Sequence, residues 1–543
     1  MLDPSEPASS NRRAAPDKTG TVSPAGQQSM VRLAGAAGII GAGNVVSRLL
    51  GLVRETVIAH LFAASPYVSA FRVAAQVPTM IFDLLIGGML SSALVPVFSE
   101  YFAPKNRREL WRLASVVFSL ALVALTGIVI LLELLAPVVA WILGGGFEPE
   151  VMAATTRLIR VVLPAVILFG VSGVLTGLLY SLQRFTFPAF GSALYNIGAI
   201  FAAVLFARSI DIYALAIGIM LGAVLQLGLL LPGLKDARLK FELDLQHPAL
   251  RRIVRLYLPI VLGLIVSNIG IAIDRNLASH TGGQSIAWMQ YATNLMQFPL
   301  GLVAAAVSLA ALPSMTQRHV SLDEAGYRGT LMTGLRLVTV LIIPATVGMF
   351  LLARPIVALV FQHGKFSPDD TQRVAQALRF YLIGLTPAAL DQLLIFAYYA
   401  RKNTLTPALV GVAAVGVYLT VALSLRSRYG MIGLVVASSA QWTAHTIIMM
   451  MLLRRTLDWR SLGEAGGKAL LASGGMGVAS YLGARWIEGL LGGEGLLPLF
   501  ETVAGAALIG IAIYALMVRL LRVGELQMIE DRVARRLGFA RFD

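Results

Sequence analysis

Residues 44–60 read NVVSRLLGLVRETVIAH, and this stretch places charges inside an otherwise apolar segment. Arg48, Arg54 and Glu55 interrupt a run of Ala, Gly, Ile, Leu and Val that is long enough to cross a membrane. A charged side chain at the centre of a bilayer costs about 2.5–3.5 kcal/mol on insertion scales, so such residues normally face a cavity or a partner. The stretch therefore predicts a membrane helix with a polar face.

The composition of the whole chain is typical of a polytopic membrane protein. The 543 residues are 57% hydrophobic and 13% charged, whereas soluble domains carry about 25% charged residues. The absence of cysteine excludes disulfides and thiol catalysis. The net charge of +15 is explained by cationic loops that set membrane topology, so we expect no nucleic-acid partner.

Fourteen segments are apolar and long enough to span a bilayer, which predicts an all-α fold of about 14 transmembrane helices. When loops are assigned alternately to the two sides, Lys and Arg favour the side of both termini by roughly three to one. We therefore expect both termini in the cytoplasm. The predicted spans lie near 36–62, 69–98, 113–143, 157–181, 187–208, 212–234, 253–279, 286–314, 330–353, 374–400, 405–425, 430–453, 466–488 and 498–521.

Two halves of the chain resemble each other at a near-constant offset. The matching pairs are VSRLLGLVRETVIAH (46–60) with VSNIGIAIDRNLASH (266–280), QVP (76–78) with QFP (297–299), and YSLQRFTFPA (180–189) with YARKNTLTPA (399–408). The offset predicts two repeat-related six-helix lobes around a central cavity, as in many transporters. The predicted organisation is a disordered cytoplasmic tail (1–30), an N-terminal lobe (31–235), a basic cytoplasmic linker (236–252), a C-terminal lobe (253–455), two additional transmembrane helices (463–523) and a basic cytoplasmic tail (524–543).

Polar side chains inside the predicted spans fall on shared helix faces. Residues three, four or seven apart lie on one side of a helix, and the first, second, seventh and eighth spans all carry such polar stripes. Because the repeat relates these four spans, the stripes predict one hydrophilic cavity between the lobes. The candidate substrate-binding residues are Ser47, Arg48, Arg54, Glu55, Arg72, Gln76, Asp83, Asn268, Asp274, Arg275, Gln290, Asn294 and Gln297.

Structural explanations of these side chains remain open. Arg48 could reach the cytoplasmic surface with its long side chain, and the Gln and Asn stripe could join helices. Arg72 with Asp83, and Asp274 with Arg275, could be internal ion pairs. The six histidines form no metal-ligand spacing with carboxylates, and no Walker sequence is present. We therefore expect no catalytic site, no metal and no direct use of ATP.

Several motifs together resemble the MurJ (MviN) family of lipid II flippases, within the multidrug/oligosaccharidyl-lipid/polysaccharide exporter superfamily. The resemblance covers about residues 36–455, and its motifs are SRLLGLVRETVIAHLF, QRFTFPAFGSALYNIGAI, WMQYATNLMQFPLGLVAAAVSLAALPSMT, FQHGKFSPDD and YYARKNTLTPALV. It implies a transporter of the bacterial inner membrane that moves the undecaprenyl-pyrophosphate-linked peptidoglycan precursor lipid II from the cytoplasmic to the periplasmic leaflet by alternating access. It also implies that Arg48 and Arg54, with Ser47 before them, meet the pyrophosphate, and that the last two helices hold the lipid tail. A monomer is the default for two lobes with an internal cavity.

The chain departs from the family pattern at several cavity positions. Many relatives have an aspartate where this chain has Ser69, and basic residues near Phe82 and Asp83, while some have an arginine at the position of Asn294. The cavity of this chain is therefore less cationic. Our hypothesis is that two other arginines supply part of the missing charge, Arg72 and Arg275.

The resemblance also raises the question of a sodium site. Some relatives bind sodium through an aspartate that matches Asp274. The acidic partner expected in the eleventh span is not evident in 405–425. We therefore expect no cofactor.

Two other functions remain compatible with the sequence. A flippase for another undecaprenyl-linked glycan, of the O-antigen or capsule type, would need the same pyrophosphate site. A cation-coupled multidrug exporter would need a proton-exchanging carboxylate, for which Asp83, Asp274 and Asp391 are candidates, but the basic first helix argues against it. A purely structural membrane protein would not need buried charge in four related helices.

Overall fold

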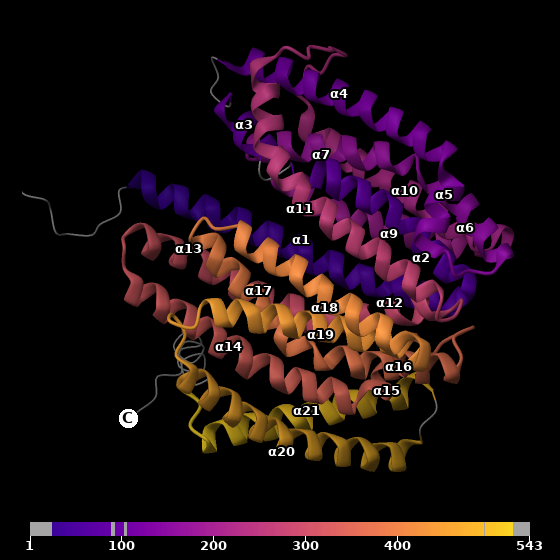
Figure 1. Cartoon of the computed structure of the whole chain (residues 1–543), viewed down its shortest axis with the longest axis vertical. Helices are drawn as coiled ribbons and strands as arrows, with labels where there is room; N and C mark the ends of the chain where they lie inside the picture. The colour runs from indigo at the N-terminus through magenta and orange to yellow at the C-terminus, as the bar shows by residue number, and fades with distance from the viewer. Residues whose placement is uncertain (1–23, 88, 90–92, 102–105, 493–494, 525–543) are drawn as a thin grey trace, which may run out of the picture.

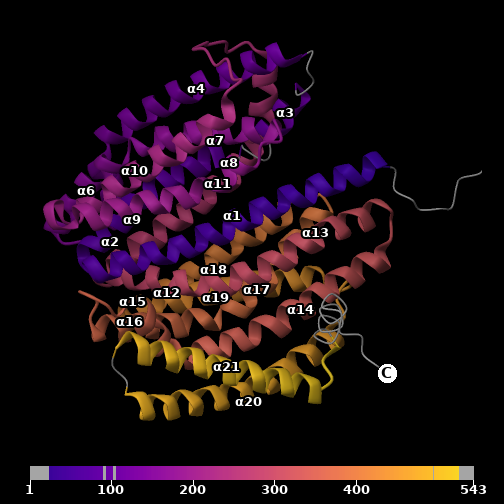
Figure 2. The ribbon, with the colours of Figure 1, turned by 180° about the vertical axis from the view of Figure 1, so that it is seen from behind.

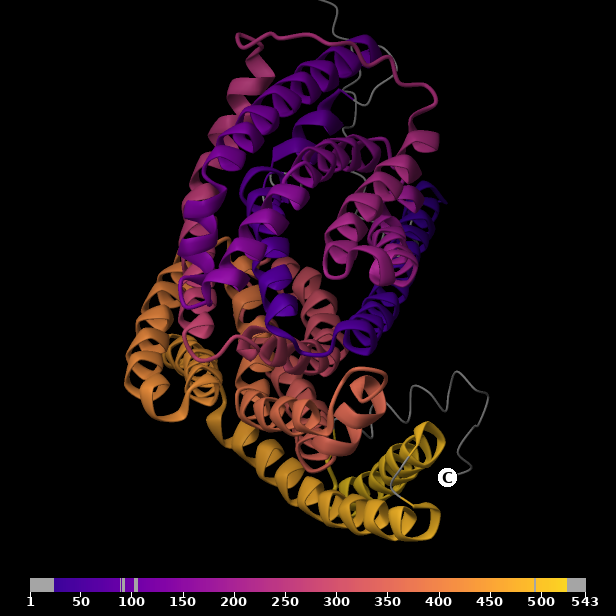
Figure 3. The same cartoon turned by 90° about the vertical axis from the view of Figure 1, so that its right-hand side faces the viewer.

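The computed structural model describes residues 24–87, 89, 93–101, 106–492 and 495–524. Its regular elements are helices, and they form three layers that appear in the same order in each view (Figures 1, 2 and 3). The N-terminal bundle comprises α1 to α10 and the C-terminal bundle comprises α12 to α19, with α11 between them. The pair α20 and α21 lies on the outer side of the C-terminal bundle. The predicted all-α class is confirmed.

Prolines begin many of these helices, because a missing N–H costs nothing in the first turn. α1 begins at Pro24, so residues 24–30, which we expected in the disordered tail, are helical. Residues 1–23 and 525–543 lie outside the described part of the chain. The N-terminal bundle consists of α1 (Pro24–Phe62), α2 (Pro66–Phe82), α3 (Val95–Glu100), α4 (Arg107–Leu134), α5 (Ala136–Gly144), α6 (Pro149–Val162), α7 (Ala165–Ser181), α8 (Thr186–Ala189), α9 (Gly191–Ile210) and α10 (Tyr213–Leu230).

The rest of the chain repeats the pattern of long helices with short turns. Helix α11 begins inside the predicted linker, at Pro248, and its first turns pack with α3 and α4 of the N-terminal bundle. The remaining helices are α11 (Pro248–Ser279), α12 (Ser285–Pro299), α13 (Ala305–Val320), α14 (Glu324–Leu351), α15 (Ala353–Phe361), α16 (Pro368–Ile383), α17 (Leu385–Ala400), α18 (Leu405–Tyr429), α19 (Met431–Leu452), α20 (Trp459–Leu491) and α21 (Leu496–Leu520).

The described helices include many that could span a membrane. Ten helices or continuous helical runs are long and apolar enough, and two bent pairs raise the number to twelve. The bent pairs are Pro248–Leu258 with Gly263–Ser279 and Pro368–Ile383 with Leu385–Ala400. Helices α1 and α20 are long but do not belong to this set, so the number of fourteen spans stays a prediction.

A proline and a π-helical turn interrupt the second helix of each half. Pro78 lies inside α2, which continues into the π-helical turn Asp83–Gly87. Pro299 ends α12, which continues into the π-helical turn Leu300–Ala304. Proline removes one backbone hydrogen bond, and a π turn changes the direction in which side chains point. In each helix the proline lies two residues after a glutamine that lines the cavities described below, Gln76 before Pro78 and Gln297 before Pro299.

Hydrogen bonds between the two bundles gather at one end of the molecule, here called the sealed end, where α1 ends and α2 begins. The backbone N–H of Lys365 donates to the carbonyl of His60 at 2.9 Å, and Tyr291 Oη donates to the carbonyl of Ala63 at 3.0 Å. Nearby, the N–H of Gly146 donates to Ser279 Oγ at 2.9 Å. These contacts join the bundles through short turns.

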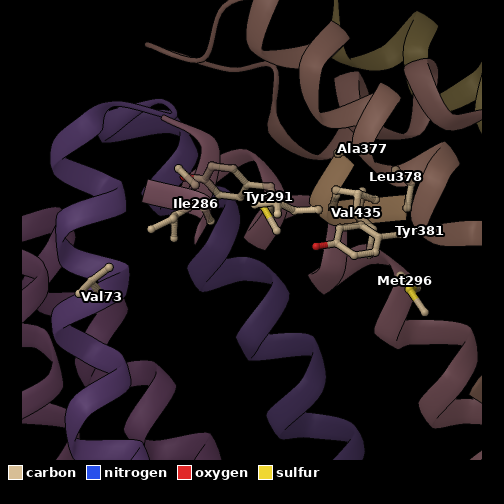
Figure 4. Packing of buried hydrophobic residues seen from close by; sticks show 14 of the residues in the cluster. Val73, Ile286, Tyr291, Met296, Ala377, Leu378, Tyr381 and Val435 are labelled. Atoms are coloured by element: carbon tan, nitrogen blue, oxygen red, sulfur yellow. The ribbon is translucent and has the colours of Figure 1, made fainter. Parts of the chain in front are cut away.

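A continuous apolar core supports the sealed end. It includes Val73 of α2, Ile286 and Tyr291 of α12, and Tyr381 of α16. Figure 4 shows these side chains in one layer that runs from the N-terminal to the C-terminal bundle. Tyr291 is fully buried. The core therefore fixes α2 against α12 beside the polar cavities.

Candidate functional site

Three cavities lie where α1, α2, α11 and α12 come together. The arginine cavity has a volume of about 450 Å³ and takes residues from α1, α2, α9 and α10. The aromatic cavity has a volume of about 460 Å³ and takes most of its residues from α11, α12, α16, α18 and α19. A small cavity of about 170 Å³ lies between α1 and α12. The arginine cavity is lined by Arg54, Arg72 and Tyr195, among others. The aromatic cavity is lined by Tyr381, Tyr418 and Trp442, and the small cavity by Arg48 and Asn294.

Shared side chains connect the three cavities. Gln76 and Gln290 line both of the larger cavities. Arg54 lines the arginine cavity and the small cavity, and Gln297 lines the small cavity and the aromatic cavity. The three spaces therefore form one polar region between the bundles, at the position where the sequence predicted a shared hydrophilic cavity.

Glu55 holds two guanidinium groups at the wall of the arginine cavity. Its side chain is 3% exposed and accepts from Arg54 Nη2 at 2.8 Å. Arg72 Nη1 also donates to Glu55 at 3.1 Å, and Arg72 Nη2 makes a second ion-pair contact. The two guanidiniums additionally lie over the rings of Tyr195 and Tyr291, at 5.8 Å and 5.6 Å from the centroids. One carboxylate against two arginines leaves a net positive charge.

Arg48 lies on the small cavity and contacts α12. Its Nη1 is 3.4 Å from the backbone carbonyl of Gln297. The guanidinium thus lies between the bundles, which agrees with a cavity residue. Gly301 of the following π-helical turn packs against the same guanidinium, so a larger residue at that position would displace it.

A short hydrogen-bonded chain leads from the aromatic cavity towards the small cavity. Arg275 Nη2 donates to Gln290 Oε1 at 2.8 Å, and Gln290 Nε2 donates to Asn294 Oδ1 at 3.0 Å. The predicted Gln and Asn stripe of α12 therefore faces the cavities and is bonded to α11. Arg275 keeps a buried Nε without a hydrogen-bond partner.

Tyr418 caps the carboxylate of Asp274 in the aromatic cavity. Its Oη donates to Asp274 Oδ1 at 2.6 Å. Within the described residues, no group of three or more His, Cys, Asp or Glu side chains could hold a metal ion. The side chain of the eleventh predicted span that contacts Asp274 is therefore a phenol, and the absence of a sodium site stays a prediction.

Two structural explanations that the sequence left open are wrong. Arg72 pairs with Glu55 and not with Asp83, because α2 points Arg72 towards α1. Within the described residues, Asp274 and Arg275 do not form an ion pair with each other. Each has its own partner instead, Tyr418 and Gln290.

Three predicted site residues line none of the three cavities. The backbone carbonyl of Ser47 accepts from Asn196 of α9, and Asn268 Nδ2 donates to Leu264 of its own helix at 2.8 Å. Asp83 begins the π-helical turn after α2.

Other cavity residues were missed by the sequence reasoning. They are aromatic, amide and hydroxyl side chains on α2, α9, α10, α11, α12, α16, α18 and α19. A search for charge in apolar segments does not find them, although Ser192 with Tyr195 and Ser438 with Gln441, three residues apart, gave a weak signal. The missed residues are Thr79, Ser192, Tyr195, Gln226, Ser267, Thr293, Tyr381, Tyr418, Ser438, Gln441 and Trp442.

Ser69 belongs to the sealed end. It is buried on α2, and its Oγ accepts from the backbone N–H of Ala287 at 3.2 Å. The position at which this chain departs from the family pattern thus joins α2 to α12.

Comparison with known proteins identifies the family. The family model described as lipid II flippase MurJ matches residues 58–489. A Burkholderia cenocepacia protein named lipid II flippase MurJ is 30% identical over 394 residues, which cover 70% of this chain and 75% of that protein. A Thermotoga maritima protein named probable lipid II flippase MurJ is 30% identical over 494 residues, which cover 90% and 97%.

Solved structures show the same fold. A structure of lipid II flippase MurJ in an inward closed conformation matches with a TM-score of 0.76 and 22% identity, covering 89% of this chain and 98% of that chain. A multidrug resistance MATE family transporter of the MOP superfamily, in an inward-facing conformation, matches with a TM-score of 0.63 and 14% identity, covering 77% and 96%. This chain belongs to the lipid II flippase MurJ family, and it is a multi-pass membrane transporter and not an enzyme.

Proposed function

We propose that this chain flips lipid II from the cytoplasmic to the periplasmic leaflet of the bacterial inner membrane, by alternating access to the cavities between its bundles. Family membership supports the substrate. The observation that carries the proposal is the cationic wall of the arginine cavity, where Arg54 and Arg72 share the buried Glu55. Guanidinium groups match the geometry of phosphate oxygens, so a pyrophosphate would neutralise the excess charge.

The two larger cavities divide the substrate between them in this proposal. The pyrophosphate lies in the arginine cavity, where it meets Arg54, and Arg48 contacts it from the small cavity that Arg54 also borders. The aromatic cavity takes the sugar and the peptide. Its Tyr418 and Trp442 offer apolar faces, while Gln441 and Arg275 offer hydrogen-bond donors.

The sealed end supports an opening step. Its contacts between the bundles are hydrogen bonds to backbone groups and hydroxyls, such as Lys365 to His60 and Gly146 to Ser279. Each such bond contributes only about 1 kcal/mol net, so the set can be broken as the bundles move. The same bundles would then close at the opposite end, as in transporters with paired repeats.

We also propose that the protein works as a monomer. In this proposal the last two helices, α20 and α21, hold the lipid tail. Helix α20 packs on α14, and large apolar side chains of α20 and α21 stay exposed, including Leu471, Val478, Leu508 and Ile511. Deleting 463–523 is expected to impair flipping. Unchanged flipping by the truncated chain would refute this role.

Growth of a bacterium depleted of its own lipid II flippase tests the proposal. The wild-type chain is expected to restore growth, whereas Arg48→Ala and Arg54→Ala fail at matched membrane levels. Arg108→Ala, at an exposed arginine in the first turn of α4, serves as the control and should restore growth. If the inserted and stable wild type fails, the substrate is another undecaprenyl-linked glycan or a drug.

A further inference from the structure

A buried ion pair lies outside the three cavities and has no part in the proposed flipping mechanism. His445 Nδ1 on α19 is 2.6 Å from Asp391 Oδ1 on α17. His445 Nε2 is 3.3 Å from the carbonyl of Pro407 on α18. The two side chains are 11% and 14% exposed. One imidazole thus joins three helices of the C-terminal bundle.

The partners of the imidazole show how many protons the pair holds. Both ring nitrogens face oxygen acceptors, and a neutral imidazole has only one N–H to donate. Both contacts are satisfied when the ring is doubly protonated, or when Asp391 carries the second proton and donates it to Nδ1. In either form the pair is neutral overall. Loss of that proton leaves a net negative charge in a buried site and one acceptor without a donor, which is costly.

The pair lies close to the wall of the aromatic cavity. Ser438 and Trp442 line that cavity, and His445 follows them on the same face of α19. A Cβ atom built on Gly411 of α18 would lie 3.9 Å from His445 Nε2, on the face of α18 that continues to Val415 and the cavity. A change at the pair would therefore be transmitted along the α18 and α19 interface.

Three charged groups on the neighbouring helices have partners away from the pair. Arg379 donates to the carbonyl of Phe350, Asp370 accepts from Trp288, and Arg336 donates to Ser461. Within the described part of the chain, the other charged or titratable groups on the neighbouring helices form no hydrogen bond or ion pair with Asp391 or His445. These groups are Asp274, Arg275, Arg318, His319, Glu324, Tyr327, Arg328, Asp369, Asp370, Arg373, Arg379, Tyr381, Tyr398, Tyr399, Tyr418, Arg426 and Arg428.

We propose that Asp391 and His445 form a proton-binding site whose occupancy is coupled to the relative position of the two bundles. With the proton bound, the imidazole holds α17, α18 and α19 together. Without the proton, the contact of α17, α18 and α19 at His445 loses a hydrogen bond and gains a negative charge. A different packing of the three helices is then favoured. Ionisable residues inside membrane segments commonly mark proton pathways. Histidine also changes charge between about pH 5 and pH 8.

The absence of cysteine allows a direct test without substrate. Spin labels on Arg108→Cys of α4 and Arg328→Cys of α14, which are exposed positions on the two bundles, report the distance between the bundles in lipid. The distance distribution is expected to change between about pH 5 and about pH 8. With His445→Gln or Asp391→Asn it should no longer depend on pH. His363→Gln should keep the wild-type response, because the imidazole of His363, in the turn after α15, bonds only to the carbonyl of Leu359 among the described residues.

Two results would overturn the proposal. One is a pH response that persists in folded His445→Gln and Asp391→Asn proteins. The other is a wild-type distance distribution that stays constant over this pH range, which decides the question even if neither variant folds. Because no lipid II is added, either result leaves the proposed flipping activity to be judged separately.

Discussion

At the scale of single residues, Glu55 controls the charge of the arginine cavity. Its carboxylate contacts Arg54 and Arg72 and is almost completely buried. When no substrate is bound, the Glu55 carboxylate is the partner of the Arg54 and Arg72 guanidinium groups. Because one carboxylate cannot neutralise two cations, the site keeps the excess positive charge that an anionic headgroup requires.

We predict that Glu55→Gln destabilises the protein by about 3 kcal/mol, because it leaves Arg72 as an unpaired buried charge. Arg72→Leu together with Glu55→Gln should recover part of this loss, since the unpaired charge is then absent. Thermal unfolding of the purified variants in detergent measures both effects through a double-mutant cycle. Purely additive losses would show that the pair is not coupled.

Single residues also show how much of the candidate site could be predicted from the sequence. Most of the predicted polar residues line the cavities, because their spacing on regular helices reports the face correctly. Asp83 lies outside the cavities although it shares a helix face with Gln76, because spacing within one helix does not show how far a cavity extends along it. The pairing of Arg72 with Glu55 joins two different helices, so no spacing within one helix could reveal it.

At the scale of helices, hydrogen bonds hold the sealed end together, and in the proposed mechanism they decide which side of the membrane reaches the cavities. Ser69 joins α2 to α12, and Ser279 joins α11 to the turn after α5. Both hydroxyls accept from backbone N–H groups. Removing them weakens the seal without changing the charge of the cavities.

We predict that Ser69→Ala with Ser279→Ala shifts the protein towards the state in which the sealed end is open. Gln76→Cys, in the two larger cavities, introduces the single cysteine of the chain. Labelling by an impermeant maleimide added on the side of the sealed end should rise several-fold in the double variant. Equal labelling rates in the two backgrounds would contradict the assignment of these hydroxyls to the seal.

The pair α20 and α21 is attached to α14 by a small apolar cluster and by Tyr514, whose Oη donates to the carbonyl of Val340 at 2.6 Å. We predict that Tyr514→Phe lowers the free energy of unfolding by about 1 kcal/mol, the usual net contribution of one hydrogen bond. Flipping should persist, because Tyr514 is remote from the cavities. Thermal unfolding and growth complementation check the two parts. A loss of growth with unchanged stability would assign Tyr514 a direct role.

At the scale of the whole molecule, the family and the fold class could be predicted from the sequence, whereas the exact path of the chain could not. Hydrophobic runs such as 113–143 and 374–400 correctly marked apolar segments. The structure divides each of them into two helices, at Leu135 and at Gly384, because hydropathy is insensitive to a bend within the membrane. Prolines and glycines near these breaks were the available signal.

We predict that transport by the whole protein does not require sodium. Asp274 is the carboxylate that would bind the ion, and it already accepts from Tyr418 at 2.6 Å. Replacing sodium by potassium or choline in reconstituted vesicles should leave the flipping rate unchanged. A rate that falls several-fold without sodium, and that Asp274→Asn makes insensitive to sodium, would show that the phenol gives way to the ion.

Recognition of the lipid II pyrophosphate by the arginine cavity is tested most directly by a rate. This is the rate at which purified protein in lipid vesicles moves labelled lipid II between leaflets. We predict that the wild type and Arg108→Ala flip lipid II. Arg54→Ala should lower the flipping rate at least tenfold, which corresponds to about 1.4 kcal/mol. An undecaprenyl-linked glycan without pyrophosphate should not be moved. Equal rates for wild type and Arg54→Ala, or flipping of the lipid that lacks pyrophosphate, would contradict the claim that the arginine cavity recognises the pyrophosphate of lipid II.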